Sequence, residues 1–158
     1  MAKKAPLVYV LNGPNLNLVG VREPEFYGTW TMKDVESAAI EVARAVGLTL
    51  DFRQSNCEGE LIDWVQEARH KKAGGIIINP AAYSHTSIGL MDAIKASGLP
   101  TIEVHLSNIH QREKFRHHSY ISSVARGVLC GLGPQGYLLA LEAMADILNV
   151  GAKIPQDT

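Results

Sequence analysis

The feature that most constrains the fold of this chain is a regular alternation of short apolar runs with longer amphipathic segments. The apolar runs are rich in valine and isoleucine, which is typical of strands covered on both faces of a sheet. They span residues 7–11, 48–52, 75–78, 101–104 and 124–129. Segments with helical spacing span residues 31–46, 58–72, 86–96 and 136–150. The alternation predicts an α/β fold with helices on both faces of a parallel sheet.

Five strands in this rhythm suit a flavodoxin-like three-layer sandwich, with a five-stranded parallel sheet in the order 2-1-3-4-5. The length of 158 residues suits one domain with one core. We find no internal repeat, low-complexity tract or break in composition. We therefore expect a single catalytic domain over residues 1–158, with a core at about 7–148 and short flexible termini.

Local signals mark several helix ends. Thr31 with Asp34 forms a possible capping box at the start of the first helix, and Gly47 is a suitable stop. Ser55 with Glu58 predicts a second, stronger capping box.

Composition excludes several classes of function. The 15 Lys and Arg residues nearly balance the 16 Asp and Glu residues, so no long-range attraction to nucleic acid or an anionic membrane is expected. Cys57 and Cys130 are far apart, which favours a reducing compartment over a disulfide framework. The apolar run at residues 7–11 is too short for a signal-peptide core, and no stretch is long enough to span a bilayer. We expect a soluble, cytoplasmic protein.

The loops that follow the predicted strands are polar. In open parallel sheets, ligands bind beyond the carboxyl ends of the strands. The loops at those ends span residues 12–17, 54–56, 79–85 and 105–108. Their amides, hydroxyls and imidazoles predict a ligand site at this edge of the sheet.

Familiar cofactor and nucleophile motifs are missing. The first loop is neither G-x-G-x-x-G nor a Walker A loop, and the chain contains no H-E-x-x-H, zinc-spaced cluster or G-x-S-x-G elbow. No lysine falls at the end of a predicted strand, which disfavours imine chemistry. The histidines, especially His105, His110, His117 and His118, leave a metal site as a minor alternative. We expect neither a metal nor a cofactor.

Glu103 and His105 are the first candidate pair. Side chains two apart in a strand share a face, so both would point the same way at the end of the fourth strand. A carboxylate beside an imidazole fixes its tautomer and favours its protonated form, which suits a general acid. A buried structural pair explains the pattern equally well.

Arg22 and Tyr27 lie in a segment, residues 20–28, that is bracketed by glycines and resembles a mobile lid. A free tyrosine has a pKa of about 10, and a nearby guanidinium favours the phenolate that a general base requires. From the residues alone, an ordinary surface tyrosine is the commoner case.

Other polar residues are candidates for binding. Arg112 and Arg116 are four apart, on one side of a helical turn, and would bind a carboxylate or hydroxyls unless they form a solvated basic face. Asn15, Asn79 and His85 would hold a water or substrate oxygen, although each alone is ordinary turn chemistry.

Several long motifs, in order, resemble the type II 3-dehydroquinate dehydratases. They are VLNGPNLNL at residues 10–18, GVREPEFYG at 20–28, QSNCEGELID at 54–63, NPAAYSHTS at 79–87 and EVHLSN at 103–108, followed by the Arg112/Arg116 segment. The match runs in register from about residue 7 to about residue 148. The family converts 3-dehydroquinate to 3-dehydroshikimate through an enolate, in the shikimate pathway or in quinate breakdown.

The resemblance implies a role for each matching residue. Tyr27 would remove the proton next to the ketone, with Arg22 and Arg112 favouring its phenolate. Asn15 would hold a water that stabilises the enolate, and His105, oriented by Glu103, would protonate the departing hydroxyl. Asn79 and the backbone amides of Leu106 and Ser107 would anchor the carboxylate, while His85 and Arg116 would bind ring hydroxyls. Asp92 would reach the site of a neighbouring subunit, because family members are dodecamers assembled from trimers.

Three other readings stay open on the residues alone. They are a flavodoxin-like module that binds a phosphate or flavin, a scaffold without catalysis, and a metal-dependent lyase that uses His105 and His110. The sparse glycine of residues 12–17 disfavours the first, and the presence of Arg22 and Tyr27 disfavours the second.

Overall fold

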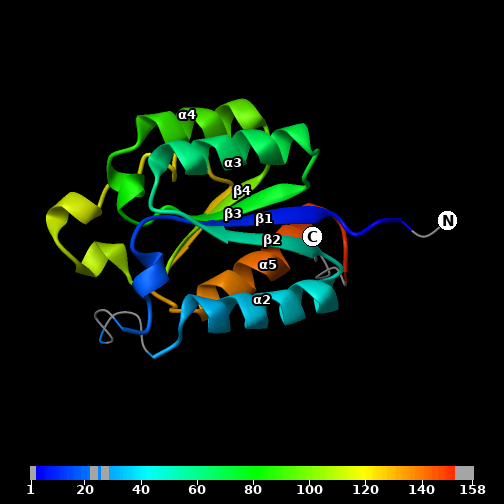
Figure 1. Ribbon diagram of the computed structural model, residues 1–158, viewed down its shortest axis with the longest axis horizontal. Coiled ribbons are helices and arrows are strands. Elements are labelled where there is room, and N and C mark those ends of the chain that lie inside the picture. The colour runs from blue at the N-terminus through cyan, green and yellow to red at the C-terminus, as the bar shows by residue number, and fades with distance from the viewer. Residues whose placement is uncertain (1–2, 22–24, 26–28, 152–158) are drawn as a thin grey trace, which may run out of the picture.

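The computed structural model describes residues 3–21, 25 and 29–151. Its central element is a parallel sheet of five strands (Figure 1). The strands are β1 (Leu7–Asn12), β2 (Thr49–Gln54), β3 (Gly75–Asn79), β4 (Thr101–His105) and β5 (Gly127–Cys130). Their order is β2-β1-β3-β4-β5, and every neighbouring pair is parallel. The predicted fold class and strand order are confirmed.

Helices cover both faces of the sheet. Figure 1 shows α2 (Met32–Val46) and α5 (Gln135–Ile147) on one face, and α3 (Glu58–His70) and α4 (Ile88–Ser97) on the other. None of the helices in the described ranges is both long and apolar enough to cross a membrane.

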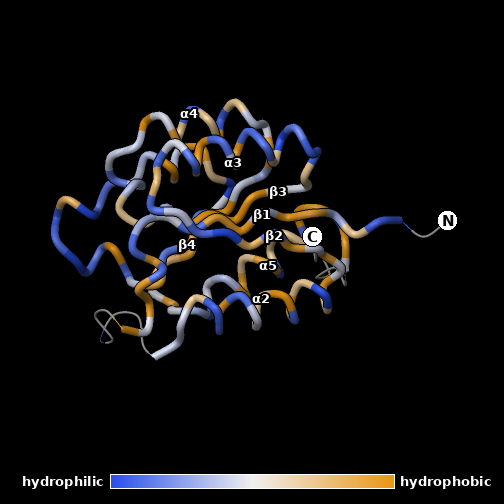
Figure 2. The backbone as a smooth tube through the Cα atoms, in the orientation of Figure 1, coloured by the Kyte–Doolittle hydropathy of each residue, from blue (hydrophilic) through white to orange (hydrophobic). Residues whose placement is uncertain are grey.

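Strand alternation builds a separate apolar core on each face. In β1, Val8 and Val10 face α2 and α5, whereas Tyr9 and Leu11 face α3 and α4. Figure 2 shows the hydrophobic strands in the middle of the sandwich, with hydrophilic residues along the helices. Burying each large aliphatic side chain contributes about 1.5–3 kcal/mol, so the two cores supply the main stabilisation of the sandwich.

The register of the sheet aligns the carboxyl ends of β2, β1 and β3. Asn12, the last residue of β1, pairs with Gln54 on one side and with Asn79 on the other. Gly13 then donates its N–H to the Asn79 carbonyl at 2.8 Å. A Cβ on Gly13 would lie only 2.4 Å from the Pro80 carbonyl oxygen, so only glycine permits this contact between the loops after β1 and β3.

Short 3-10 helices fill the edge beyond these strand ends. They are η1 (Leu16–Leu18), η2 (Ala81–His85), η3 (Ile109–Gln111) and η4 (Lys114–Arg116). The loops after β1, β3 and β4 therefore meet in one place, as the sequence predicts.

One predicted cap is confirmed and another is wrong. Thr31 and Asp34 form a capping box in both directions, and Gly47 ends α2 in the left-handed region at φ 84°. The Ser55–Glu58 box does not form, because α3 begins one residue after Cys57 and Ser55 Oγ instead accepts the Cys57 N–H at 3.0 Å.

Among the element boundaries that differ from the predicted ones, the starts of β5 and α4 have a clear local cause. β5 begins at Gly127 rather than at residue 124, because the N–H groups of Val124 and Ala125 both bond the Ile121 carbonyl in a turn. α4 begins at Ile88 rather than at residue 86, because Ser87 caps it by accepting the Leu90 N–H.

Candidate active site

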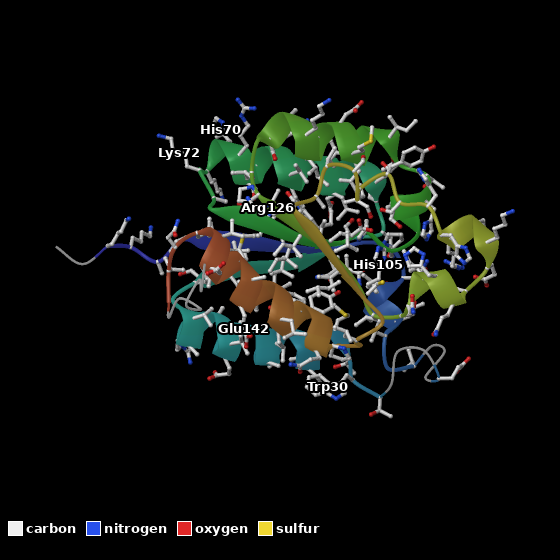
Figure 3. The ribbon with its side chains drawn as sticks, turned by 180° about the vertical axis from the view of Figure 1, so that it is seen from behind. Trp30, His70, Lys72, His105, Arg126 and Glu142 are labelled. Atoms are coloured by element: carbon white, nitrogen blue, oxygen red, sulfur yellow. The ribbon has the colours of Figure 1, made fainter. Side chains whose placement is uncertain are left out.

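A cavity of about 170 Å³ opens at the carboxyl ends of β1, β3 and β4. Eight residues singled out from the sequence line it, namely Asn15, Asn79, His85, His105, Leu106, Ser107, Arg112 and Arg116. Pro14, Leu16, Val19, Ala81, Ala82 and Ile109 complete the lining. Figure 3 shows His105 toward the end of the sheet away from His70 and Lys72, which lie at the far end of α3. Residues from Pro14 to Arg116, far apart in the sequence, are thus brought to one pocket by the strand ends.

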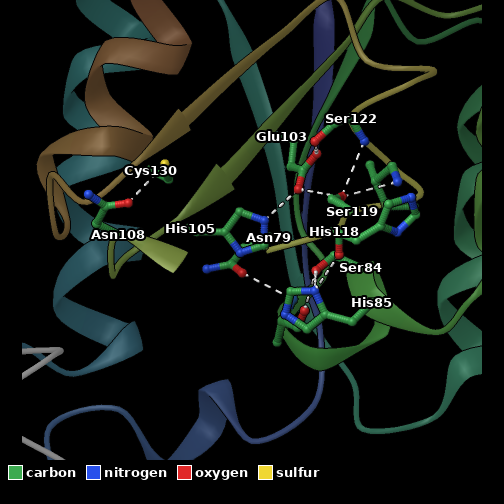
Figure 4. Close-up of polar contacts among 12 residues, drawn as sticks. Asn79, Ser84, His85, Glu103, His105, Asn108, His118, Ser119, Ser122 and Cys130 are labelled. Atoms are coloured by element: carbon green, nitrogen blue, oxygen red, sulfur yellow. Dashed lines mark hydrogen bonds and ion pairs between the residues drawn. The ribbon is translucent and has the colours of Figure 1, made fainter. Parts of the chain in front are cut away.

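His105 and Glu103 form a buried pair at the end of β4. His105 Nε2 lies 2.5 Å from Glu103 Oε2, and the two side chains are 5% and 0% exposed. Two serines from the segment before β5 complete the pair, because Ser119 Oγ donates to Oε2 at 2.8 Å and Ser122 Oγ donates to Oε1 at 2.6 Å (Figure 4). Both carboxylate oxygens are therefore hydrogen-bonded to protein side chains.

The hydrogen bonds to Glu103 keep it ionised although it is buried. Burial by itself raises the pKa of a carboxyl, but the bond and positive charge of His105, with the bonds from Ser122 and Ser119, hold the pKa of Glu103 below its ordinary value. An ionised Glu103 fixes the proton on Nε2 of His105, which leaves Nδ1 as the ring nitrogen that can exchange a proton.

His85 lies beside this pair and is held neutral. Its ring stacks on that of His105 with a centroid separation of 6.5 Å and an interplanar angle of 11°. Burial lowers the pKa of His85, and the positive charges of His105 and Arg116 lower it further, against the opposing bond to the His118 carbonyl. Because Nδ1 bonds that carbonyl at 2.7 Å, Nδ1 carries the proton and Nε2 is left as an acceptor.

The side-chain amide of Asn79 is oriented by hydrogen bonds that involve α5 and β1. Its Nδ2 donates to the Tyr137 hydroxyl of α5 at 2.9 Å, and that hydroxyl donates to Asn12 Oδ1 at 2.6 Å. The Ala81 N–H donates to Asn79 Oδ1 at 3.2 Å. Burial raises the pKa of Tyr137, so the phenol keeps its proton. Asn79 therefore donates to the Tyr137 hydroxyl, and that hydroxyl donates to Asn12. The amide of Asn79 is thus fixed at the cavity wall.

Asn15 reaches the cavity from a strained turn. It precedes η1 in the left-handed region at φ 67°, which asparagine tolerates better than most residues. Its backbone N–H donates to Asn56 Oδ1 at 2.9 Å, which ties the loop after β1 to the loop after β2. Asn15 lines the cavity together with residues of the loop after β4.

Arg112 and Arg116 both line the cavity, but they do not share one helical turn as expected. Arg112 follows η3, whereas Arg116 ends η4. Arg116 Nε bonds Glu113 Oε2 at 2.6 Å, and its guanidinium lies 5.1 Å from the centroid of the Phe115 ring. The two cations bring positive charge to the pocket, which suits an anionic ligand.

The structure places one predicted binding residue apart from this cavity wall. Asp92 is exposed on α4 and lies away from the cavity, so its expected place in a neighbouring subunit's site stays a prediction. Arg22 and Tyr27 lie outside the described residues.

The histidines do not gather into a metal centre. His110 and His117 approach with ring centroids 5.9 Å apart, and His105 is paired with Glu103 instead. Within residues 3–21, 25 and 29–151, no group of three or more His, Cys, Asp and Glu side chains is placed to hold a metal ion.

Sequence reasoning missed the residues behind the cavity wall. Ser119 and Ser122 bond Glu103, and Asn12 and Tyr137 hold Asn79. Asn12 carried a signal, because it is a polar residue at the end of an apolar strand. The serines and Tyr137 carried none, since they meet their partners only through the tertiary fold.

Comparisons with known proteins point to one family. A family model described as dehydroquinase class II matches residues 6–145. A 3-dehydroquinate dehydratase from Streptomyces coelicolor is 56% identical over 149 residues, which make up 94% of each chain. The solved structure of a type II dehydroquinase from Propionibacterium acnes is 43% identical with a TM-score of 0.86, over 91% of this chain and 99% of that one. The structure of a type II dehydroquinase from Butyrivibrio crossotus is 38% identical with a TM-score of 0.87, over 90% and 99% of the two chains.

Proposed function

Because the chain belongs to the class II dehydroquinase family and is a hydro-lyase, we propose that it converts 3-dehydroquinate to 3-dehydroshikimate and water through an enolate. The observation that carries the proposal is the buried His105–Glu103 pair, because its His105 lines a cavity that Arg112 and Arg116 also line. An enolate mechanism needs a base, a group that stabilises the developing oxyanion, and an acid. The residues of the cavity and of the segment at 20–28 supply all three.

The reaction proceeds in two proton transfers. The Tyr27 phenolate removes a proton from the carbon next to the ketone, and the electron pair of that C–H bond moves onto the carbonyl oxygen as an enolate. A water held by Asn15 donates a hydrogen bond to this oxygen. The enolate then collapses, the adjacent C–O bond breaks, and His105 gives the leaving oxygen the proton that completes a water molecule. The proton on Tyr27 returns to His105 through solvent after product release.

The other cavity residues hold the substrate. Asn79 and the backbone amides of Leu106 and Ser107 bind its carboxylate, with hydrogen bonds strengthened by the negative charge. His85, which accepts through Nε2, and Arg116 bind the ring hydroxyls. Arg22 and Arg112 favour the phenolate of Tyr27 electrostatically. The mechanism uses neither a metal nor a cofactor.

The protein's setting follows from the same family membership. We infer one catalytic domain, a cytoplasmic location, and a dodecamer of trimers in which Asp92 completes the site of a neighbouring subunit. Its place is either in the shikimate pathway, which leads to chorismate and the aromatic amino acids, or in quinate catabolism.

Product formation from 3-dehydroquinate tests the proposal directly. The enone product absorbs in the ultraviolet, whereas the substrate does not, so turnover appears as a rise in absorbance. The assay is run with a strong chelator, and again after borohydride treatment in the presence of substrate, which traps an imine. We expect full turnover in both cases. Loss of turnover with chelator would point to a metal-dependent lyase, and loss after borohydride would point to imine chemistry.

A further inference from the structure

Glu103 is the most enclosed ionisable side chain in the site, and its partners are unequal. Oε2 is shared by His105 Nε2 and Ser119 Oγ, whereas Oε1 receives the hydroxyl of Ser122 alone at 2.6 Å. Figure 4 shows the two serines on the side of the carboxylate away from the His105 ring. The carboxylate therefore has a catalytic partner on one side and a pair of hydroxyl donors on the other.

The two hydroxyls are held in place by the fold. Ser119 Oγ accepts the N–H groups of Ile121 and Ser122, each at 3.2 Å, and Ile121 is fully buried in the core beneath α3 and α4. The Tyr120 N–H donates to the Ser84 carbonyl at 2.8 Å, which ties the serine turn to η2. Donors fixed in this way need no rearrangement when charge changes nearby, which is the requirement for electrostatic preorganisation.

We propose that Ser119 and Ser122 are positioning residues for the dehydration, which align Glu103 beneath His105 and keep the transferable proton on His105 rather than on the carboxylate. The proposal rests on the proposed function and deepens it. Neither serine lines the cavity, so both act through Glu103 and make no contact with substrate.

The sign of their effect follows from charge. After His105 gives up its proton, the pair carries a net negative charge, and before that it is neutral overall. Hydrogen-bond donors to the carboxylate stabilise the negatively charged state more than the neutral one. Removing a donor therefore makes the pair hold its proton more tightly, and makes His105 a weaker acid toward the leaving hydroxyl. The fixed bonds that keep the pKa of Glu103 low agree with this direction.

The other charged groups near the His105–Glu103 pair are the same in the wild type and in the Ser122 variants. His85 of η2 stacks on His105, Arg116 of η4 lines the same cavity, and Arg112 follows η3. Arg22 and Tyr27 lie outside the described residues. A substitution at Ser122 leaves the side chains of His85, Arg112 and Arg116 in place, so a shift caused by that change reports on Glu103.

Ser122→Ala is the sharpest variant, because the bond to Glu103 is the side-chain contact that it removes. Ser119→Ala is less specific, since it also removes a turn cap. Ser123→Ala is the matched control, because Ser123 is exposed in the same turn and bonds the Tyr120 carbonyl and Met91 Sδ instead. Ser122→Thr keeps the hydroxyl and serves as the conservative rescue.

The measurement is the pH dependence of kcat and KM for 3-dehydroquinate, with folding checked by circular dichroism. For Ser122→Ala we expect the basic limb of the kcat profile to move up by about one pH unit. We expect kcat at neutral pH to fall about tenfold while KM stays within about twofold of the wild type. Ser123→Ala should match the wild type, and Ser122→Thr should restore most of kcat and the position of the basic limb.

Several outcomes would overturn the inference. An unshifted or downward-shifted basic limb in folded Ser122→Ala would do so, and so would an equal loss of activity in Ser123→Ala. If the alanine variant does not fold, Ser122→Cys keeps the side-chain shape with a weak donor, and the same profile decides. A wild-type protein that does not act on 3-dehydroquinate would overturn the proposed function itself, which is a distinct result.

Discussion

Two histidines in the cavity have different hydrogen-bond partners, which suit them to different roles. His85 and His105 are stacked histidines, yet one bonds a carbonyl and the other bonds a carboxylate. A neutral His85 can accept a hydrogen bond from a ligand hydroxyl, whereas an imidazole on a carboxylate can store and release a proton. In the proposed mechanism, two neighbouring copies of one side chain would thus serve binding and acid catalysis.

Tyr27→Phe is the residue-level test of the proposed base. Phenylalanine keeps the aromatic ring but cannot accept a proton, so kcat should fall by at least about 10²-fold while substrate binding persists. Steady-state kinetics together with a direct titration of substrate binding measure the two effects separately. Turnover near the wild-type rate would remove Tyr27 from the mechanism.

At the scale of elements, a buried chain of hydrogen bonds links β1, β3 and α5 behind the cavity. Tyr137 stands at its centre, between Asn12 and Asn79. The chain crosses an otherwise apolar core, where an unpaired polar group is costly. It therefore couples the packing of α5 to the orientation of an amide in the cavity wall.

Tyr137→Phe should affect both stability and binding. It leaves Asn12 Oδ1 and Asn79 Nδ2 without their shared partner, which should destabilise the fold by about 1–3 kcal/mol. KM should rise more than kcat falls, because a misoriented Asn79 weakens substrate binding. Denaturation curves and steady-state kinetics measure these effects.

Tyr9→Phe is the matched control for that variant. Tyr9 is equally buried, and its hydroxyl donates to Glu67 Oε2 at 2.6 Å, away from the cavity. It should lose stability and keep the wild-type KM. A Tyr137→Phe enzyme with an unchanged KM would show that the chain is structural alone.

At the scale of the whole molecule, the predicted role of Asp92 in binding requires more than one chain. It lies exposed on α4, away from the cavity that holds the other candidates. In a trimer with cyclic symmetry, one surface of each subunit meets a different surface of the next. An exposed carboxylate on α4 is then able to complete a partner's site.

Mixing two defective variants tests this shared site. His105→Asn lacks the acid but keeps Asp92, whereas Asp92→Ala keeps His105. In co-assembled oligomers, random pairing should give complete sites at about a quarter of positions and recover a matching share of wild-type activity. Each variant assembled alone is the control. Activity of the mixture equal to the average of the two pure variants would contradict the shared site.

The pH dependence of stability also belongs to the whole molecule. His85, Glu67 and Glu103 all have lowered pKa values in the fold, so the folded state binds fewer protons than the unfolded state as pH falls. The stabilisation from His85 is present above its ordinary pKa of 6.5 and is lost as pH falls through its lower folded value. The carboxylates act in the same direction below their ordinary pKa of 4.5.

Thermal unfolding at pH 7.5 and 5.5 tests the contribution of His85. The wild type should lose melting temperature on acidification, and His85→Gln should lose less, because glutamine does not titrate. Protein concentration is kept constant, since oligomers melt at temperatures that depend on it. An identical loss in both proteins would show that other groups dominate this pH window.

Much of the fold and part of the candidate site could be predicted from the sequence. The strands, their parallel order and the pairing of Glu103 with His105 follow from periodicities that act over a few residues. The errors fell at the ends of elements, where a different local hydrogen bond formed in place of the predicted arrangement. Ser55 caps a neighbouring N–H rather than forming a box, and residues 124–126 turn instead of extending β5.

The amino-acid sequence by itself determined the order of the elements, the layers they form and the polar edge of the sheet at which the cavity opens. Side-chain periodicity and turn chemistry depend on residues close together in the sequence, so they can be recognised without the tertiary structure. Only the tertiary structure decided which groups support that edge. The Ser122 hydroxyl reaches Glu103 across 19 residues, and the Tyr137 hydroxyl reaches Asn12 across 125. Such contacts depend on how the strand ends and loops pack together, and no short pattern in the chain encodes them.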